Sequence, residues 1–137
     1  MRIFITGEEG FIAQNLPKSL LKLGSEAVTL NNDMNMRGTE VCVYNNTVEE
    51  WVNALRKHGV DLIIHNAAVV GTDVVALNPG ESTLSNVTGT HTICRAAKRL
   101  KIPVCYIGTT VIYDTPNYQD DWITEESTKY PRTLYGI

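Results

Sequence analysis

The sequence predicts an α/β fold with a doubly wound parallel sheet. Five short apolar or β-branched runs recur along its 137 residues, and helical or turn-forming segments separate them. The first run leads through two glycines into a helical segment. Because strands that alternate with helices pair in parallel, this rhythm indicates repeated strand–helix–strand units.

The first predicted strand is the most clearly defined. Residues 2–6 read RIFIT, and their apolar side chains do not alternate with polar ones. A strand that is buried on both faces has no need of alternation, so we expect this strand at the centre of the sheet. The predicted strands are, in chain order, Arg2–Thr6, Glu26–Leu30, Glu40–Tyr44, Asp61–His65 and Pro103–Gly108.

The first predicted helix covers Phe11 to Leu23. Leucines recur on one face of it, and Gly24 provides its C-terminal stop. Pro17 lies inside the segment and has no N–H for the carbonyl of Ala13. We therefore expect a kink or an irregular turn at Pro17.

Two more helices are predicted further along the chain. The first spans residues 47–58, because its opening threonine is a good N-cap with Glu50 three residues later. The second spans residues 81–100, where apolar residues recur at steps of three and four. Residues 114–126 are rich in acids and turn formers and predict a surface loop, after which residues 130–135 would begin a new element.

The composition is that of one ordinary globular domain. Apolar residues make up 43% of the chain and charged residues 20%, with a formal net charge of −3. This mild acidity argues against nucleic acid as a partner, and no apolar run is long enough to span a membrane. Because the N-terminus begins a core strand rather than a leader, we expect a cytoplasmic protein.

The cysteines and histidines do not predict a metal site. Cys42, Cys94 and Cys105 have no C-x-x-C or histidine-paired spacing and lie in apolar stretches, so we expect them in the core. His65 has no second ligand at a useful spacing, and we expect it to pack against the sheet.

The turn after the first strand has the composition of a phosphate-binding loop. Gly7 lets the chain turn sharply, and Gly10 removes a side chain where the helix N-terminus would face a pyrophosphate. Unpaired N–H groups and the helix dipole would bind that group. The spacing G-x-x-G-x-x-A is also an ordinary way to begin an α/β domain, so both interpretations stay open. A Walker A loop is excluded, because no Gly-Lys-Ser/Thr follows.

Further motifs lie after the later strands and on the third predicted helix. Asn66-Ala67-Ala68 comes directly after a buried strand, where open α/β sheets bind ligands. The other segments are Asn86–Thr90 on the helix, Ile107–Tyr113 at the end of the last strand, and then Thr124–Ser127 and Tyr135-Gly136.

Together these motifs resemble those of the extended short-chain dehydrogenase/reductase family, the NAD-dependent epimerase/dehydratase group that acts on nucleotide sugars. The pattern T-G-x-x-G-F-I-G is similar to residues 6–13, with alanine in place of the last glycine. H-x-A-A matches residues 65–68, N-V-x-G-T matches 86–90, and S-S-x-x-V-Y-G is similar to 109–114. Residues 67–71, with the later Asn78-Pro79, are similar to the GDP-fucose synthase branch.

The resemblance implies a Rossmann-type domain with strand order 3-2-1-4-5 and a dinucleotide across the carboxyl ends of strands one and four. It implies that the Thr109 hydroxyl hydrogen-bonds the substrate oxygen and that Tyr135 is the general acid/base. Hydride transfer at a nicotinamide ring would accompany this proton exchange. The alternative for both residues is structural, with Thr109 as a β-branched strand residue and Tyr135 as an ordinary aromatic.

The resemblance also implies a set of cofactor-binding residues. They are Gly7, Gly10, Phe11, Ile12, Asn31, Asp33, Asn66, Ala67, Ala68 and Asn86. Asp33 would bind the ribose hydroxyls of NAD, whereas Arg37 could instead meet the 2′-phosphate of NADP. Glu8 and Glu9 would repel that phosphate, so NAD is favoured and NADP stays open.

The resemblance covers the N-terminal half of such an enzyme. The family places a lysine four residues after the tyrosine, and the sequence ends at Ile137, before that position. We therefore expect residues 1–137 to be an incomplete NAD(P)-binding Rossmann domain, inactive without the substrate-binding part that takes the nucleotide sugar. A non-catalytic dinucleotide-binding or partner-binding module is the alternative, and a flavodoxin-like domain is a third. An uncovered sheet edge or apolar face would favour self-association into a homo-oligomer.

Overall fold

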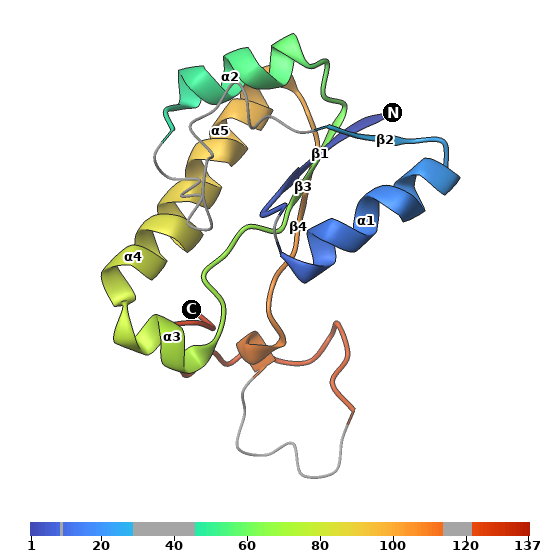
Figure 1. Ribbon diagram of the computed structural model, residues 1–137. Coiled ribbons are helices and arrows are strands. Elements are labelled where there is room, and N and C mark those ends of the chain that lie inside the picture. The colour runs from blue at the N-terminus through green and yellow to red at the C-terminus, as the bar shows by residue number, and fades with distance from the viewer. Residues whose placement is uncertain (9, 29–45, 114–121) are drawn as a thin grey trace.

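Four parallel strands form the sheet of the computed structural model, which describes residues 1–8, 10–28, 46–113 and 122–137 (Figure 1). The strands are β1 (Arg2–Thr6), β2 (Glu26–Val28), β3 (Leu62–His65) and β4 (Val104–Tyr106). Their order in the sheet is β2-β1-β3-β4. The α/β class and the relative order of these strands are confirmed, and the predicted strand Glu40–Tyr44 lies outside the described residues.

β1 lies at the centre of the sheet. It pairs in parallel with β2, where Phe4 is opposite Val28, and with β3, where Ile5 is opposite Ile64. Residues 3–6 are all buried, which explains why their side chains do not alternate in polarity. β3 pairs in turn with β4, so the C-terminal ends of these three strands meet at one edge of the sheet.

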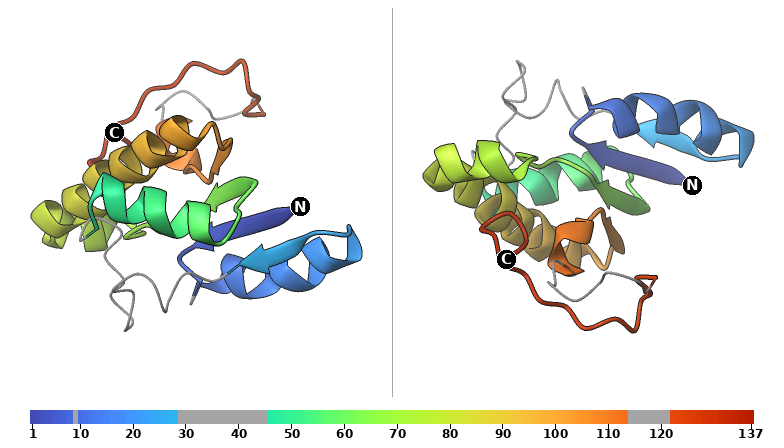
Figure 2. Two further views of the ribbon diagram at one scale, coloured as in Figure 1. Left: turned by 90° about the horizontal axis from the view of Figure 1, so that it is seen from above. Right: turned by 90° about the horizontal axis from the view of Figure 1, so that it is seen from below.

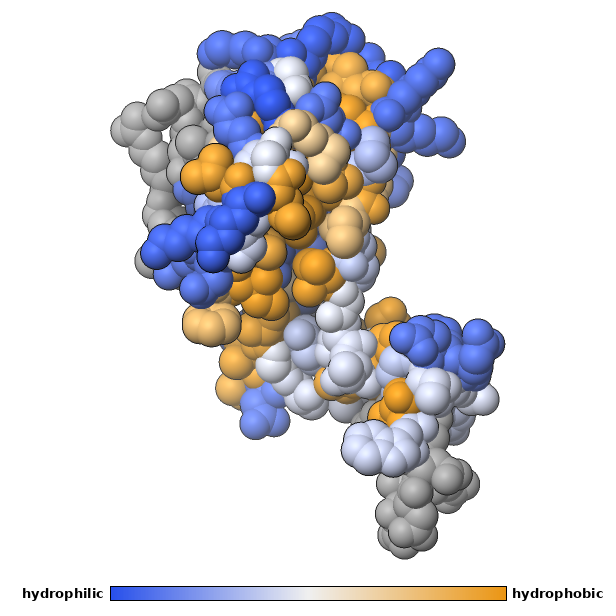
Figure 3. Space-filling view, turned by 90° about the vertical axis from the view of Figure 1, so that its right-hand side faces the viewer, coloured by the Kyte–Doolittle hydropathy of each residue, from blue (hydrophilic) through white to orange (hydrophobic). Residues whose placement is uncertain are grey.

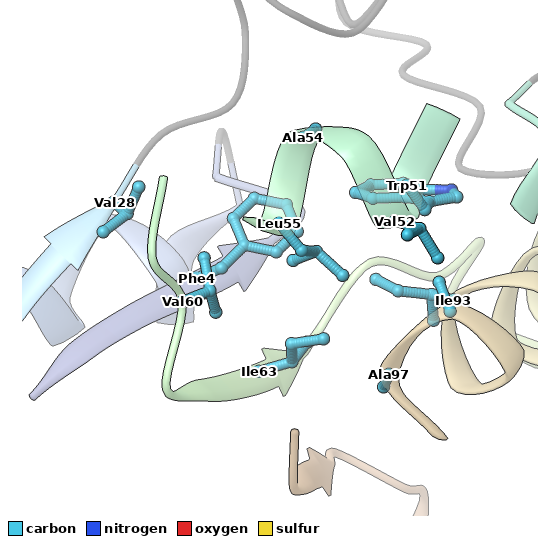
Figure 4. Close-up of a cluster of buried hydrophobic side chains, with 11 residues drawn as sticks. Phe4, Val28, Trp51, Val52, Ala54, Leu55, Val60, Ile63, Ile93 and Ala97 are labelled. Atoms are coloured by element: carbon cyan, nitrogen blue, oxygen red, sulfur yellow. The ribbon is translucent and has the colours of Figure 1, made fainter. Parts of the chain in front are cut away.

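Helices cover both faces of this sheet (Figure 2). On one face, α1 (Phe11–Lys22) packs through Ala13 and Leu16 against Ile3 and Ile5. On the other face lie α2 (Val48–Lys57) and α5 (Thr90–Leu100). The larger core fills this second interface (Figure 4), with buried side chains from Phe4, Val28, Trp51, Val52, Ala54, Leu55, Val60, Ile63, Ile93, Ala96 and Ala97.

α1 runs without a break through Pro17, so the predicted kink or irregular turn does not interrupt the helix. The helix ends at Lys22, before the predicted Leu23. Gly24 then adopts φ +72°, and the N–H of Ser25 donates to the carbonyl of Leu20 at 2.9 Å. This is the left-handed glycine stop that the sequence predicts.

Apolar side chains gather on the face of the molecule that Figure 3 shows. Phe11, Ile12 and Leu21 of α1 are exposed, as is Leu23 directly after it. Large contiguous patches of exposed apolar surface mark interaction sites in soluble proteins. No helix in the described part of the chain is long and apolar enough to cross a membrane.

The prediction that the cysteines lie in the core is wrong for Cys94 and Cys105, which are both exposed. On α5 the neighbouring Ile93 takes the inward position and is fully buried. Cys105 lies on β4, which is an edge strand of the described sheet. Cys42 lies outside the described residues.

α2 begins with the capping box that the sequence predicts. The Thr47 hydroxyl accepts the N–H of Glu50 at 3.3 Å, and the Glu50 carboxylate accepts the N–H of Thr47 at 2.7 Å. This backbone hydrogen bond lowers the pKa of the Glu50 carboxyl, with a further contribution from the Thr47 hydroxyl. The helix ends at Lys57, with His58 as its C-cap.

Replacing Thr47 with alanine is expected to destabilise the protein by about 1 kcal/mol, because the first turn of α2 loses its side-chain cap. Urea unfolding followed by circular dichroism measures the change. Asn53→Ala, at an exposed position of the same helix, is the matched control and should change the free energy of unfolding by less than about 0.5 kcal/mol. Equal losses in the two variants would contradict a specific role for the cap.

The predicted helix over residues 81–100 is divided into three segments. These are α4 (Pro79–Thr83), the π-helical turn η2 (Leu84–Gly89) and α5. The sequence does not predict the short helix α3 (Thr72–Leu77) that precedes them. Asn78 separates α3 from α4 with φ −129° and ψ 60°, outside the helical region, which is disfavoured for a residue before proline. The π-helical turn widens the helix at Asn86, and such turns are frequent at functional sites.

The C-terminal segment folds back onto the end of β4. After β4 comes the short helix η3 (Thr110–Tyr113), and the carbonyl of Ile112 accepts the N–H of Tyr130 at 2.7 Å. The new element predicted from residue 130 is a turn closed by the N–H of Gly136 on the carbonyl of Thr133. Residues 122–126 are exposed, as predicted for a surface loop.

Candidate active site

The motifs singled out in the sequence converge at the carboxyl edge of the sheet. Thr6, the last residue of β1, is the register partner of His65 in β3, and His65 is the partner of Tyr106 in β4. The residues that follow these three therefore emerge side by side. They are the glycine turn, the Asn66-Ala67-Ala68 segment and the segment that leads to Thr109.

The glycine turn is shaped by a close approach of two backbones. Gly7 has φ +70°, and a Cβ atom there would lie 2.9 Å from Cα of Ala67. Its carbonyl accepts the N–H of Gly10 at 2.9 Å, and a Cβ on Gly10 would lie 3.1 Å from the same oxygen. Gly7 is thus required by both conformation and space, and Gly10, the N-cap of α1, places no side chain over the first turn of the helix.

The other predicted cofactor residues fall into two groups. Phe11 and Ile12 are exposed at the start of α1, with 84% and 46% of their surface accessible. Ala67 packs against Gly7, and the side-chain nitrogen of Asn66 lies near Gly10, 3.7 Å from where a Cβ would stand. Asn31 and Asp33 lie outside the described residues.

A buried hydrogen-bond network connects these segments. Thr6 Oγ1 accepts the N–H groups of Asn66 at 3.0 Å and of Ala67 at 2.9 Å. The same oxygen lies 2.7 Å from Nδ1 of His65. On the other side of the ring, Nε2 of His65 lies 2.8 Å from Oγ1 of Thr90, whose hydroxyl donates to the carbonyl of Asn86 at 2.7 Å.

The donors and acceptors of this network fix the tautomer of His65. Thr6 Oγ1 already accepts two N–H groups, so its own proton donates to Nδ1 of the ring. Thr90 donates its proton to a carbonyl, so its oxygen must accept from Nε2. His65 is therefore neutral, with its proton on Nε2.

Burial also favours the neutral form of His65. The residue is 1% exposed, and burial lowers the pKa of its imidazole from 6.5 to about 4. The charged ring loses hydration and gains no compensating partner. The expectation that His65 packs within the sheet is met, and the network adds a role that the sequence did not indicate.

Asn86 holds the chain that follows β3. Its side-chain oxygen accepts the N–H of Val69 at 2.8 Å, and its side-chain nitrogen donates to the carbonyl of Val69 at 2.9 Å. The side-chain amide of Asn86 thus binds both backbone groups of Val69, in the way that the backbone of a neighbouring strand binds them in a sheet. Asn86 places the segment after Ala68 beside the π-helical turn η2.

Replacing Asn86 with alanine is expected to cost about 1–3 kcal/mol of folding free energy, because two half-buried backbone groups of Val69 lose their partners. Hydrogen exchange at the Val69 amide should accelerate more than exchange in β1. Asn78→Ala is the matched control, since the Asn78 amide makes one exposed contact of 3.4 Å with the carbonyl of Val74. Unchanged protection at Val69 in Asn86→Ala would contradict this role.

A cavity of about 470 Å³ lies next to this network. The residues that line it come from the strand ends, the helical segments after β3 and the C-terminal turn: Ala68, Val75, Ser82, Thr83, Asn86, Val87, Tyr106, Ile107, Gly108, Thr109, Leu134, Tyr135 and Ile137. The structure therefore brings Thr109 and Tyr135 to one cavity, together with Asn86 and Ala68. Thr109 Oγ1 accepts the N–H of Val111 at 3.2 Å, and no acceptor for its own proton is recorded among the described residues.

Two features of the site escaped sequence reasoning. The first is the pairing of Thr6 with His65, for which the only signal was a polar residue at the end of each of two apolar strands. The second is Ser82, which lines the cavity, is 2% exposed and has no hydrogen-bond partner for its hydroxyl among the described residues. No sequence signal distinguishes Ser82 from other helical serines.

Comparison with known proteins gives the family. A sequence model of the NAD dependent epimerase/dehydratase family matches residues 3–137. The chain belongs to this family. Protein CapI of Staphylococcus aureus is 27% identical over an alignment of 153 positions, which covers 99% of this chain and 46% of that protein.

Solved structures agree with the fold of the epimerase/dehydratase family. UDP-glucose-4-epimerase from Stenotrophomonas maltophila, with bound NAD and formylated UDP-arabinopyranose, superimposes with a TM-score of 0.78 at 15% identity. RMD from Pseudomonas aeruginosa, complexed with NADPH, gives 0.77 at 21% identity. Each match covers 99% of this chain but only 44% and 45% of the other, so the chain spans less than half the length of these proteins.

Within this epimerase/dehydratase chain, the predicted residues thus form two adjoining groups. Gly7, Gly10 and Ala67 shape the turn at the start of α1, whereas Thr109 and Tyr135 line the cavity. The described residues contain no group of three or more His, Cys, Asp or Glu side chains that could hold a metal ion.

Proposed function

We propose that residues 1–137 form the NAD(P)-binding part of an enzyme that epimerises, dehydrates or reduces nucleotide sugars. The observation that carries the proposal is the cavity shared by Thr109 and Tyr135. It lies at the same sheet edge as the turn of Gly7 and Gly10. Membership of the NAD-dependent epimerase/dehydratase family supports a dinucleotide cofactor.

The glycine turn is the part of the chain that fits a pyrophosphate. Gly10 precedes the first turn of α1, so no side chain caps the N–H groups there. These groups and the helix dipole would hold the phosphates, with Phe11 and Ile12 supplying N–H groups and Asn66 lying alongside. Asp33 and Asn31 are proposed for the ribose. When bound, the nicotinamide would accept or return a hydride.

Thr109 and Tyr135 would then act on the substrate oxygen. The Thr109 hydroxyl would donate its proton in a hydrogen bond to that oxygen. Tyr135 would exchange a proton with the same oxygen as the hydride moves. The cavity volume falls in the range of small-molecule sites, roughly 300–1,000 Å³. These roles follow the family pattern at the matching positions of this chain.

The substrate class is supported by the related structures. Three of them are UDP-glucose 4-epimerases whose bound molecules include NAD, formylated UDP-arabinopyranose or UDP-glucose. NADPH is bound in RMD from Pseudomonas aeruginosa, so the choice between NAD and NADP stays open here. Self-association through an uncovered sheet edge or apolar face also stays a prediction, which light scattering on the purified chain would test.

Calorimetric titration of the chain with NAD⁺ and, separately, with NADP⁺ tests the proposal. We expect saturable binding of at least one dinucleotide. A second titration adds UDP-glucose to the chain saturated with that dinucleotide, and Thr109→Ala should weaken any binding observed. Dinucleotide binding would support a cofactor-binding part, and an added response to UDP-glucose would favour an enzyme over a non-catalytic dinucleotide-binding module. A folded chain that binds neither dinucleotide would contradict the proposed function.

A further inference from the structure

We propose that His65 is a positioning residue that ties the glycine turn to the wall of the cavity containing Thr109 and Tyr135. The imidazole joins β1 to α5 through hydrogen bonds at both ring nitrogens. Its consequence for dinucleotide binding rests on the proposed function. The positioning itself is a property of the chain and can be tested separately.

On the Nδ1 side, the ring controls the shape of the glycine turn. Its contact with Thr6 directs the Thr6 proton away from the backbone, so that the Thr6 oxygen can accept the N–H groups of Asn66 and Ala67. Ala67 is the residue whose Cα and N would lie 2.9 and 3.0 Å from a Cβ on Gly7. A shift of the Thr6 oxygen would therefore move the backbone of Ala67, against which Gly7 packs.

On the Nε2 side, the ring controls the cavity wall. Nε2–H donates to Thr90, and Thr90 donates to the carbonyl of Asn86 in the π-helical turn η2. Asn86 in turn holds Val69 by both ends of its side-chain amide. The ring and the Asn86 amide therefore fix the two ends of the segment between β3 and Val69.

The arrangement requires a neutral ring. The groups that face the imidazole are Thr6 from β1, Thr90 from α5 and the ring of Tyr106 from β4, whose centroid is 5.8 Å away. Within the described residues, no carboxylate or ammonium group is recorded in contact with it. A proton on Nδ1 would point at a Thr6 oxygen that already accepts two N–H groups. The Thr6 oxygen could then accept the N–H of the ring only by losing a hydrogen bond from Asn66 or Ala67.

The test begins with ¹⁵N-detected ring signals of the wild-type chain at pH 7. We expect the Nε2–H tautomer of His65; an Nδ1–H tautomer would overturn the proposal. This measurement needs no substitution, so it can overturn the proposal even where a variant fails to fold.

Two conservative variants then separate the two sides of the ring. In His65→Asn the side-chain oxygen stands where Nδ1 stood and can accept from Thr6, whereas in His65→Gln the side-chain nitrogen can reach Thr90. We expect the backbone amide signals of Asn86 and Val69 to move more in His65→Asn, and that of Ala67 to move more in His65→Gln. His91→Gln, at an exposed position of α5, is the matched control and should leave all three in place. Shifts confined to residues 64–66 in both variants would overturn the proposal.

Affinity for the preferred dinucleotide provides the functional measurement. We expect His65→Ala to weaken binding roughly two- to thirtyfold, with His65→Asn and His65→Gln between it and the wild type. Unchanged affinity in folded His65→Ala would overturn the link between the ring and the binding site. If the wild-type chain binds no dinucleotide, the proposed function fails, while the tautomer and the amide shifts still decide whether His65 positions the two segments.

Discussion

Replacing Gly7 with alanine is expected to destabilise the protein by about 2–5 kcal/mol and to abolish dinucleotide binding. Two costs combine at this position. The backbone has φ +70°, which costs a residue with a Cβ atom about 1–2 kcal/mol. The new Cβ would also lie 2.9 Å from Cα of Ala67, and backbone held by the Thr6 hydroxyl cannot move aside as a flexible side chain would.

Gly24→Ala is the matched control for this prediction. Gly24 has nearly the same φ, +72°, and no described atom lies within 4 Å of where its Cβ would stand. It should therefore show only the conformational cost of about 1–2 kcal/mol and retain binding. Urea unfolding and calorimetric titration of both variants make the comparison. Equal losses of stability would mean that the close approach to Ala67 contributes nothing.

Acidification from pH 6.5 to pH 4 is expected to remove about 3 kcal/mol of stability through His65 alone. Burial lowers the pKa of the folded-state imidazole from 6.5 to about 4. Below pH 6.5 the unfolded chain binds a proton at His65 that the folded chain does not, so falling pH favours unfolding. Well above pH 6.5 both states are neutral at this residue, and well below pH 4 both are protonated, so most of the change arises within this window.

The measurement compares the wild type with His65→Gln by urea unfolding at pH 8, 7, 5.5 and 4. Carboxylates titrate in the same range and destabilise both proteins alike, so the difference between them isolates His65. We expect the wild type to lose more stability than the variant between pH 6.5 and 4, and the two curves to run parallel above pH 7. Parallel curves throughout would show that His65 titrates in the folded chain as it does in the unfolded one.

Local signals in the sequence predicted much of this fold. The uninterrupted apolar run of β1 indicated a central strand, and it is buried on both faces. Thr47 and Glu50 form the predicted capping box, since both partners of that motif lie within one turn. Gly24 ends α1 in the predicted left-handed conformation. In each case the interaction that decides the structure is made within a few residues.

The features that the sequence did not predict depend on distant partners or on helix geometry. Thr6 and His65 are 59 residues apart, and neither residue alone indicates that the Thr6 hydroxyl will donate its proton to the imidazole. The π-helical turn at Leu84–Gly89 follows a residue pattern that an ordinary helix would satisfy equally well. Thr109 and Tyr135 were singled out by family resemblance, and only the fold shows that one cavity contains both.

The hydrogen bonds of Thr6 determine when, during synthesis of the chain, the glycine turn can take its final shape. The glycine turn is synthesised before the residues whose N–H groups hold Thr6, because those residues lie 60 and 61 positions later. Parallel pairing of β1 with β3 has to come first, and such long-range pairing is slow. The shape of the glycine turn therefore depends on residues that are synthesised later. A nascent chain that ends before α5 would contain the glycine motif without the contacts that shape it.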